Sequence, residues 1–377
     1  MLGHDASFGY IKAVELAASS SIVHKRTGYL LCSCTLSPDH EFRFMLVNQM
    51  QRDLASSSVL EICAALIAVT NLITADMVPA IQFEVVKMMD HANETVRKKA
   101  VIALHRFYQL APDAVDRHDL IDKLRKVICD RDPSVMGSCL NVMESLSTVD
   151  PIPFKDLVPS LISILKQVIE HRLPSEYDYH RVPAPWIQMK IVRILANLGR
   201  NDANASNGMY EIVGECMRKA DVGINAGYAI VYECVRTITC IYPNATLLDA
   251  AAEAISRFVS SKSQNLKYFG VTGLAAIVES HPQYAEQHQM SVIECLEDRD
   301  ETLQRRTLDL LYKMTNPMNV QFITEKLLHF LRGTTDPFLK EDLTTKVCRL
   351  AERYAPNNLW CVWNKSLFLV CSMIFIF

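Results

Sequence analysis

The sequence predicts an all-α protein: a right-handed α-solenoid of about nine HEAT- or armadillo-like pairs of antiparallel helices. Three observations lead to this fold class. An apolar pattern recurs about every 37 residues, caps and helix breakers separate its segments, and only 12 of the 377 residues are glycine. A fixed period of 20 to 50 residues indicates stacked units, none of which can bury its apolar face alone. Scarce glycine suits long helices.

Each repeated segment begins with an apolar residue, which is followed by a small residue or a gap four positions later and by another apolar residue eight positions later. Successive starting residues lie 36, 37, 39, 52, 43, 36, 37 and 36 positions apart. The starting residues are Val23, Val59, Val96, Val135, Ile187, Ile230, Leu266, Leu303 and Leu339. The spacing therefore predicts repeated units and favours an interaction scaffold over an enzyme.

The unit that begins at Asn93 shows how one repeat is built. Asn93 precedes an apolar run and can cap a helix there. The inward positions of that helix fall three and four apart, which is one helical face; they are Val96, Ala100, Ala103, Leu104 and Phe107. Pro112 stops the helix. A second helix is expected with Leu120, Leu124, Val127 and Ile128 facing inward.

Acidic turns precede several of these helices, and basic residues follow within their first turns. Asp298–Asp300 precedes Leu303, and Asp336 precedes Leu339. Acids before a helix and bases inside it can form a ladder of ion pairs from unit to unit. The alternative is that the bases contact a partner or lipid phosphates. The basic candidates for such a contact are Lys25, Arg26, Arg97, Lys98 and Lys99.

One interval, from Val135 to Ile187, exceeds the mean period by about 15 residues. The excess lies in residues 170–186, where three prolines favour extended backbone. Insertions in solenoids map to loops on one face and often to contact sites. Two interpretations of this segment stay open, a packed structural loop and a contact site. The aromatic candidates for a contact are Tyr177, Tyr179 and Trp186.

Composition and motifs favour binding over catalysis. The net charge is −3 with a pI near 6.4, which gives no general attraction for nucleic acid. The twelve cysteines show no paired zinc spacing, and no signal peptide is evident, so we expect a cytoplasmic protein with reduced thiols. Phosphate-binding glycine loops and hydrolase motifs are absent. His281 and His288 lie seven apart, but Pro282 weakens a metal site. We expect no cofactor, metal or catalytic residue.

Several long strings resemble the large-chain adaptins of vesicle-coat adaptor complexes. They include MLGHDASFGYIKAVELA at the start, VRKKAVIALHRF, YHRVPAPWIQMKIVRILANLG at 179–199 and IECLEDRDETLQRRTLDLLYKMT at 293–315. The resemblance covers residues 1–358 and is greatest to epsilon-type chains of the fourth adaptor-protein complex, in a plant-like version.

The resemblance implies a trunk that pairs with a second large adaptin of beta type and with medium (mu) and small (sigma) chains. It also implies recruitment by an Arf-type GTPase to the cytosolic face of the trans-Golgi network, peripheral membrane association, and binding of cargo sorting signals. From fold alone, a nuclear-transport receptor or a phosphatase scaffold is the alternative. An enzyme with an α-solenoid body is a third possibility, but it lacks a visible site.

Both ends of the chain depart from the adaptin pattern. The first residues resemble a segment that is internal in adaptins, where further helices precede it. We therefore expect apolar surface such as Ile11, Val14 and Leu16 to be exposed. We expect an adaptin trunk at 1–358 and a divergent apolar tail at 359–377. Ser366–Phe377 is too short to span a bilayer. We interpret the tail as a gene-model truncation; a tail anchor and a buried terminal segment are the alternatives.

Overall fold

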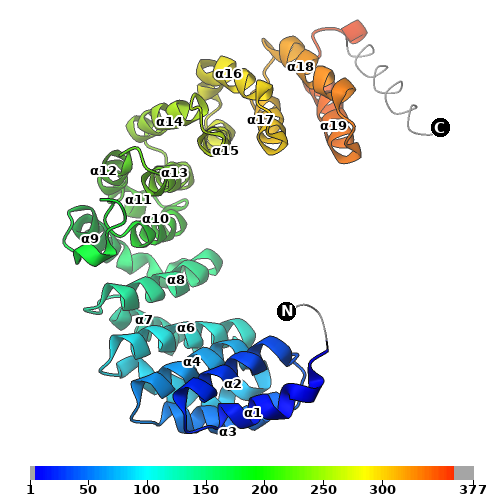
Figure 1. Ribbon diagram of the computed structural model, residues 1–377. Helices are drawn as coiled ribbons and strands as arrows, with labels where there is room; N and C mark the ends of the chain where they lie inside the picture. The colour runs from blue at the N-terminus through cyan, green and yellow to red at the C-terminus, as the bar shows by residue number, and fades with distance from the viewer. Residues whose placement is uncertain (1–4, 361–377) are drawn as a thin grey trace. The chain divides into compact units, whose positions relative to one another are not determined.

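The computed structural model describes residues 5–360, and α-helices follow one another through that range (Figure 1). The only bridges of β type among these residues are two isolated ones, Tyr179–Val182 and Arg200–Ile241. Successive antiparallel helix pairs confirm the predicted all-α solenoid. Of the predicted tail at 359–377, residues 361–377 lie outside the described residues, and the boundary at 358 stays a prediction.

Among the described residues, the first compact unit comprises 5–157 and 186–194. Its helices pack as the pairs α1/α2, α3/α4, α5/α6 and α7/α8, and α2, α4, α6 and α8 form one continuous row (Figure 1). The bounds are α1 Tyr10–Ala17, α2 Ile22–Thr35, α3 Phe42–Leu54, α4 Val59–Leu72, α5 Val78–Lys87, α6 Glu94–Leu110, α7 Arg117–Val127 and α8 Pro133–Val149. Each pair thus buries its apolar face against the next.

Among the described residues, the second compact unit comprises 158–185 and 195–360. It contains the pairs α12/α13, α14/α15, α16/α17 and α18/α19. Its helices are α9 Val158–Ile169, α11 Ala203–Asn207, α12 Tyr210–Ala220, α13 Asn225–Cys240, α14 Ala245–Val259, α15 Gln264–Ser280, α16 Ala285–Glu294, α17 Glu301–Lys313, α18 Val320–Gly333 and α19 Pro337–Tyr354. Helix α10, Pro185–Gly199, contributes residues to both units.

Helix α6 forms as the sequence predicts. The Asn93 side chain accepts hydrogen bonds from the amides of Thr95 (2.9 Å) and Val96 (3.4 Å), which satisfies donors at the helix start. All five predicted inward residues of α6 are buried, and the helix ends before Pro112. In α7, Leu120, Leu124 and Ile128 are buried, whereas Val127 is half-buried.

Arg43 joins the carboxyl ends of two helices in the first unit. Its guanidinium donates to the carbonyl oxygens of Leu36, the C-cap of α2 (2.6 Å), and of Leu72, the last residue of α4 (2.9 Å). Helix ends leave such carbonyls without intrahelical partners. A buried arginine from α3 therefore fixes where both helices end, and burial lowers the pKa of that guanidinium.

The predicted starting residues occupy different depths. Val96, Val135, Ile187, Ile230 and Leu303 are buried, and Val59, Leu266 and Leu339 are half-buried. Val23, the first of the starting residues, does not face the core, because its side chain is 67% exposed. Helix α2 instead turns Lys25, Tyr29 and Cys32 toward the core. The ammonium of Lys25 can lie there because acidic groups of neighbouring helices bind it.

Candidate functional site

Ion pairs join successive repeats in the way the acidic turns predict. Arg97 on α6 reaches Asp130, which lies in the turn before α8, through two hydrogen bonds of 2.8 Å. Lys267 on α15 lies 2.8 Å from Asp298, and Arg305 on α17 lies 2.5 Å from Asp336. The Arg97 guanidinium lowers the pKa of Asp130, and Asp298 has a pKa of about 2 because Lys267 donates to it. Arg97 therefore has a structural role.

Lys25 is a member of a buried polar cluster and not a surface contact. Its side chain is 5% exposed, and its ammonium lies 2.5 Å from Asp53 and 3.0 Å from Glu61. Tyr29 donates to the other oxygen of Asp53 at 2.7 Å. The expectation that Lys25 meets a partner or a membrane does not fit this position, because a buried charge bound by two carboxylates is unavailable to either.

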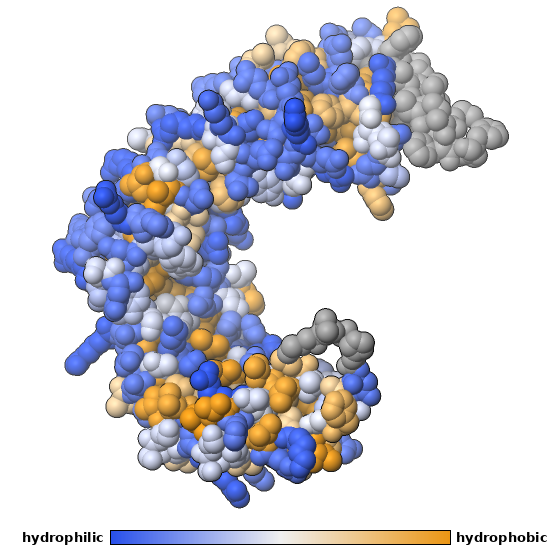
Figure 2. Space-filling model, viewed as in Figure 1, coloured by the Kyte–Doolittle hydropathy of each residue, from blue (hydrophilic) through white to orange (hydrophobic). Residues whose placement is uncertain are grey.

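An apolar groove lies between α2 and α4, and sequence reasoning missed it. It encloses about 330 Å³. Leu30, 62% exposed, and Ile67, 43% exposed, stand on opposite walls, and the small residues Ala64 and Ala68 leave the space between them. The complete lining is Val23, Arg26, Thr27, Tyr29, Leu30, Ser33, Ala64, Ile67, Ala68 and Asn71. Figure 2 shows apolar side chains gathered over these N-terminal helices.

One basic side chain lies at the groove. Arg26 lines the groove and is exposed, and within residues 5–360 no acidic partner contacts it. Lys98 and Lys99 on α6 are half-exposed. A groove with apolar walls and a cationic rim suits a protein segment that carries apolar anchors and a nearby acid. A signal was present in the sequence: Val59–Leu72 is apolar on nearly every side, more than core packing needs.

The predicted insertion, residues 170–186, contains a short hairpin. Tyr179 and Val182 exchange backbone hydrogen bonds of 2.9 and 3.0 Å, and the amide of Ala184 donates to Tyr177 at 3.2 Å. Tyr177 is half-buried, Tyr179 is 45% exposed and Trp186 is 58% exposed. Val182 and Ala184 are the buried residues of the hairpin.

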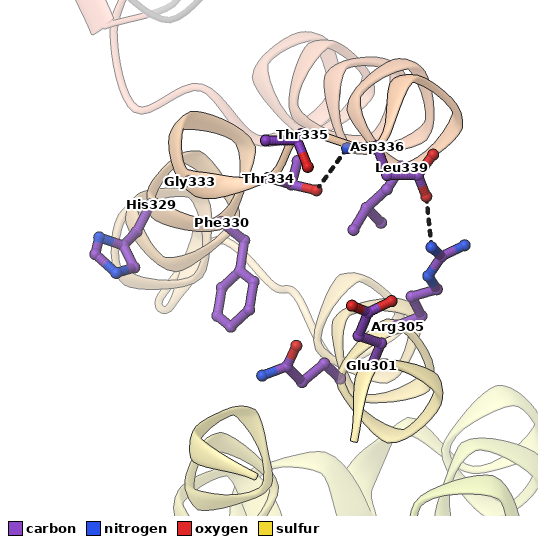
Figure 3. Close-up of a pocket in the computed structure, with 10 residues that line it drawn as sticks. Glu301, Arg305, His329, Phe330, Gly333, Thr334, Thr335, Asp336 and Leu339 are labelled. Carbon is purple, nitrogen blue, oxygen red and sulfur yellow. Dashed lines mark hydrogen bonds and ion pairs between the residues drawn. The ribbon is translucent and has the colours of Figure 1, made fainter. Parts of the chain in front are cut away.

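A second cavity, of about 390 Å³, lies among α17, α18 and α19 (Figure 3). Figure 3 shows Arg305 paired with Asp336, and the Asp336 amide donating to the Thr334 hydroxyl. Asp336 also caps α19 by accepting from the Phe338 amide at 3.1 Å. Arg305, Thr334 and Asp336 thus already bind one another within the lining of this cavity.

Neither cavity has the convergent groups of a catalytic centre. Among the described residues, no cluster of three or more His, Cys, Asp or Glu could hold a metal ion. Across the same residues, no helix combines the length and hydropathy that crossing a bilayer requires. What the α2–α4 groove can do chemically is bind apolar side chains.

Comparison with known proteins decides the family. Residues 1–367 match the family described as "Adaptin N terminal region". The chain belongs to the adaptin N-terminal family. The AP-4 complex subunit epsilon of Arabidopsis thaliana is 47% identical over 96% of this adaptin chain, and AP-4 complex subunit epsilon-1 of Homo sapiens is 41% identical over 96%. The chain spans 38% and 32% of the lengths of these two relatives.

Solved structures agree on the fold. A homology model of the full-length AP-3 complex in an intermediate open conformation contains a chain with a TM-score of 0.60 and 20% identity, over 99% of this adaptin and 66% of that chain. A structure of Kap95p with RanGDP gives a TM-score of 0.60 at 10% identity, over 93% of this adaptin and 46% of that chain. At such identities both show the solenoid fold alone, so the second gives no support to a nuclear-transport role.

Proposed function

We propose that this adaptin chain is a scaffold subunit of a vesicle-coat adaptor complex in intracellular protein sorting, and that it acts by binding and not by catalysis. The observation that carries the proposal is the family match through residue 367 together with 47% identity to an AP-4 epsilon subunit. Stacked helix pairs suit this role because they provide extended surfaces while each repeat depends only on its neighbours.

We propose that the α2–α4 groove is the binding site for the small (sigma) adaptor chain. Leu30 and Ile67 expose apolar surface on opposite walls of one groove, and covering such surface releases about 25 cal/mol per Å². Arg26 at the edge adds a charge that selects an acidic neighbour on the partner. Arg26, Lys98 and Lys99 remain candidates for partner or membrane contact; Lys25 and Arg97 act inside the trunk.

The finer parts of the proposal come from the family resemblance. They are pairing with a beta-type large adaptin and a medium (mu) chain, recruitment by an Arf-type GTPase, and peripheral association with the trans-Golgi network. The exposed and half-exposed bases of the first unit, Arg26, Lys98 and Lys99, are compatible with an anionic surface nearby.

Co-expression tests the proposed function directly. The chain is produced with beta-type, medium and small adaptor chains, each with a different tag, and the purified material is measured by native mass spectrometry. Stoichiometric recovery of the partners is the expected result. Recovery of the chain alone, with the other three assembled normally among themselves, would contradict the proposal.

A further inference from the structure

The hairpin at Tyr177–Ala184 holds an unusual concentration of left-handed backbone. The non-glycine residues with positive φ in the described chain are His171 (57°), His180 (48°), Arg181 (70°), Ala184 (37°) and Asn201 (56°). Three of the five lie in this hairpin, and His171 lies earlier in the same loop. Left-handed backbone disfavours residues with a Cβ, and such outliers persist where surrounding structure enforces them.

The turn itself consists of His180 and Arg181. Two-residue hairpin turns with positive φ at both positions favour Asn-Gly, whose small or locally bonding side chains fit there. This hairpin instead carries two large side chains at the strained positions. The hairpin is anchored, because Val182 and Ala184 are almost fully buried and backbone hydrogen bonds close the turn. The exposed tip is therefore held in one geometry.

The tip presents one cation beside two aromatic rings. The Tyr179 and His180 rings meet edge to face, with centroids 4.5 Å apart. Arg172, elsewhere in the same loop, is paired with Glu170 at 2.7 Å, and His171 lies 3.5 Å from Asp178. Arg181 is exposed, and within the described residues it contacts no acid. Its guanidinium is free to donate a forked pair of hydrogen bonds.

We propose that the tip of this hairpin, Tyr179–Arg181, is a recognition finger that grips an Asp or Glu carboxylate on a partner protein. A guanidinium fork matches a carboxylate in two parallel hydrogen bonds, which adds direction to attraction. Because the turn already holds the backbone of Arg181 in place, less entropy is lost on binding. His180 and Arg181 occupy strained turn positions, and Arg181 supplies the guanidinium that binds a carboxylate. An Asn-Gly turn would relieve the strain but would have no such group.

The charge of the loop favours a protein partner over a membrane. Residues 170–186 contain two arginines and three acids, Glu170, Glu176 and Asp178, so the loop has a net charge of −1 with neutral histidines. Attraction to an anionic bilayer requires several clustered cations, and the acids here oppose it. A single guanidinium on a rigid turn suits a single carboxylate.

The test uses the full chain and a preformed subcomplex of beta-type, medium and small adaptor chains; the choice of this partner rests on the proposed function. Affinity is measured for the wild type and for Arg181→Glu. We expect Arg181→Glu to weaken binding about tenfold or more. Arg172→Glu is the matched control, since Arg172 is exposed in the same loop but already paired; it should change affinity less than about twofold.

A second variant separates lost recognition from misfolding. His180→Asn with Arg181→Gly places the favoured residues in the turn, so the melting temperature should rise by about 1–3 °C. This variant should nevertheless bind as weakly as Arg181→Glu. A photo-cross-linker at Tyr179 should label a segment of the partner that contains an acid, and reversing that acid to arginine should restore binding to Arg181→Glu. The same cross-linker at Tyr242, 50% exposed, is the control.

The outcomes are distinct. If the wild type does not bind the subcomplex, the proposed function fails and the finger with it. If the wild type binds and Arg181→Glu binds equally well, or if cross-links from Tyr179 stay within the chain, the finger alone is overturned. Sedimentation with vesicles that contain phosphatidylserine is the remaining arm, and binding there that is lost in Arg181→Glu would also overturn the protein-carboxylate proposal.

Discussion

Gly28 on α2 lies directly against the backbone of Ala17 at the end of α1. A β-carbon on Gly28 would stand 2.2 Å from the Ala17 amide nitrogen and 2.8 Å from the carbonyl oxygen of Ala13. Backbone atoms cannot move aside as a flexible side chain can. The close approach of these two helices, which form the first pair of the N-terminal unit, therefore depends on glycine at this position.

Gly28→Ala should separate α1 from α2. We expect the free energy of unfolding of the first unit to fall by about 3 kcal/mol or more, because overpacking against backbone has no easy relief. Gly137→Ala in α8 is the matched control: its new carbon would meet only Ile187 at 3.8 Å, and the gain in helix propensity should stabilise by about 0.5–1 kcal/mol. Urea unfolding followed by circular dichroism measures both, and equal effects would refute the close-contact explanation.

Lys25→Met should be strongly destabilising. It leaves Asp53 and Glu61 without the ammonium that binds them, and breaking a buried pair on one side costs about 3–5 kcal/mol. Lys12→Met removes the exposed pair with Glu15 and should change stability by less than about 1 kcal/mol. Chemical denaturation of both variants makes the comparison. Similar small losses would show that the Lys25 cluster is not the anchor that the structure indicates.

The Lys267–Asp298 ion pair should make the free energy of unfolding depend on pH in the acidic range. The pKa of Asp298 is about 2 in the folded protein, against 3.8 for an unperturbed aspartate, chiefly because Lys267 donates to it. The unfolded chain takes up the proton first as pH falls, so this contribution is present above about pH 4 and disappears as pH falls through about 2. The difference in unfolding free energy between the wild type and Asp298→Asn should therefore shrink between pH 5 and 2. A difference that is constant with pH would contradict the assignment.

Substitutions on the groove walls should impair assembly without impairing folding. Leu30→Glu and Ile67→Glu place a charge in the groove, and we expect each to weaken association with the small adaptor chain about tenfold or more. Melting temperatures should change little, because both side chains are substantially exposed in the chain alone. Phe83→Glu on α5, 77% exposed but outside the groove lining, is the control. Affinities would be measured by isothermal titration, and an unaffected Leu30→Glu would remove the groove from the interface.

Local signals explain what could be predicted from the sequence. Asn93 as a cap, the apolar spacing of α6 and the acidic turn at Asp298 are all readable within one repeat, and the structure confirms them. The orientation of α2 could not be derived in this way. Lys25 can face inward only because Asp53 and Glu61, which lie 28 and 36 positions away in the sequence, bind its ammonium group.

The groove and the hairpin could not be predicted from the sequence, for two different reasons. Apolar spacing alone does not distinguish Leu104, which packs in the core, from Leu30, which stands on a groove wall. The hairpin carries His180 and Arg181 where a turn of its type favours Asn-Gly, so the usual local signal is missing. Proline spacing in residues 170–186 predicted extended backbone but not the turn that closes it.

The most direct measurement is oxidative footprinting of side chains in the chain alone and in the chain bound to the small adaptor chain. Leu30 and Ile67 should become several-fold less reactive in the complex, while Phe83 stays unchanged. A stable complex in which Leu30 and Ile67 are oxidised as fast as in the chain alone would contradict the claim that this solenoid holds its partner at the α2–α4 groove.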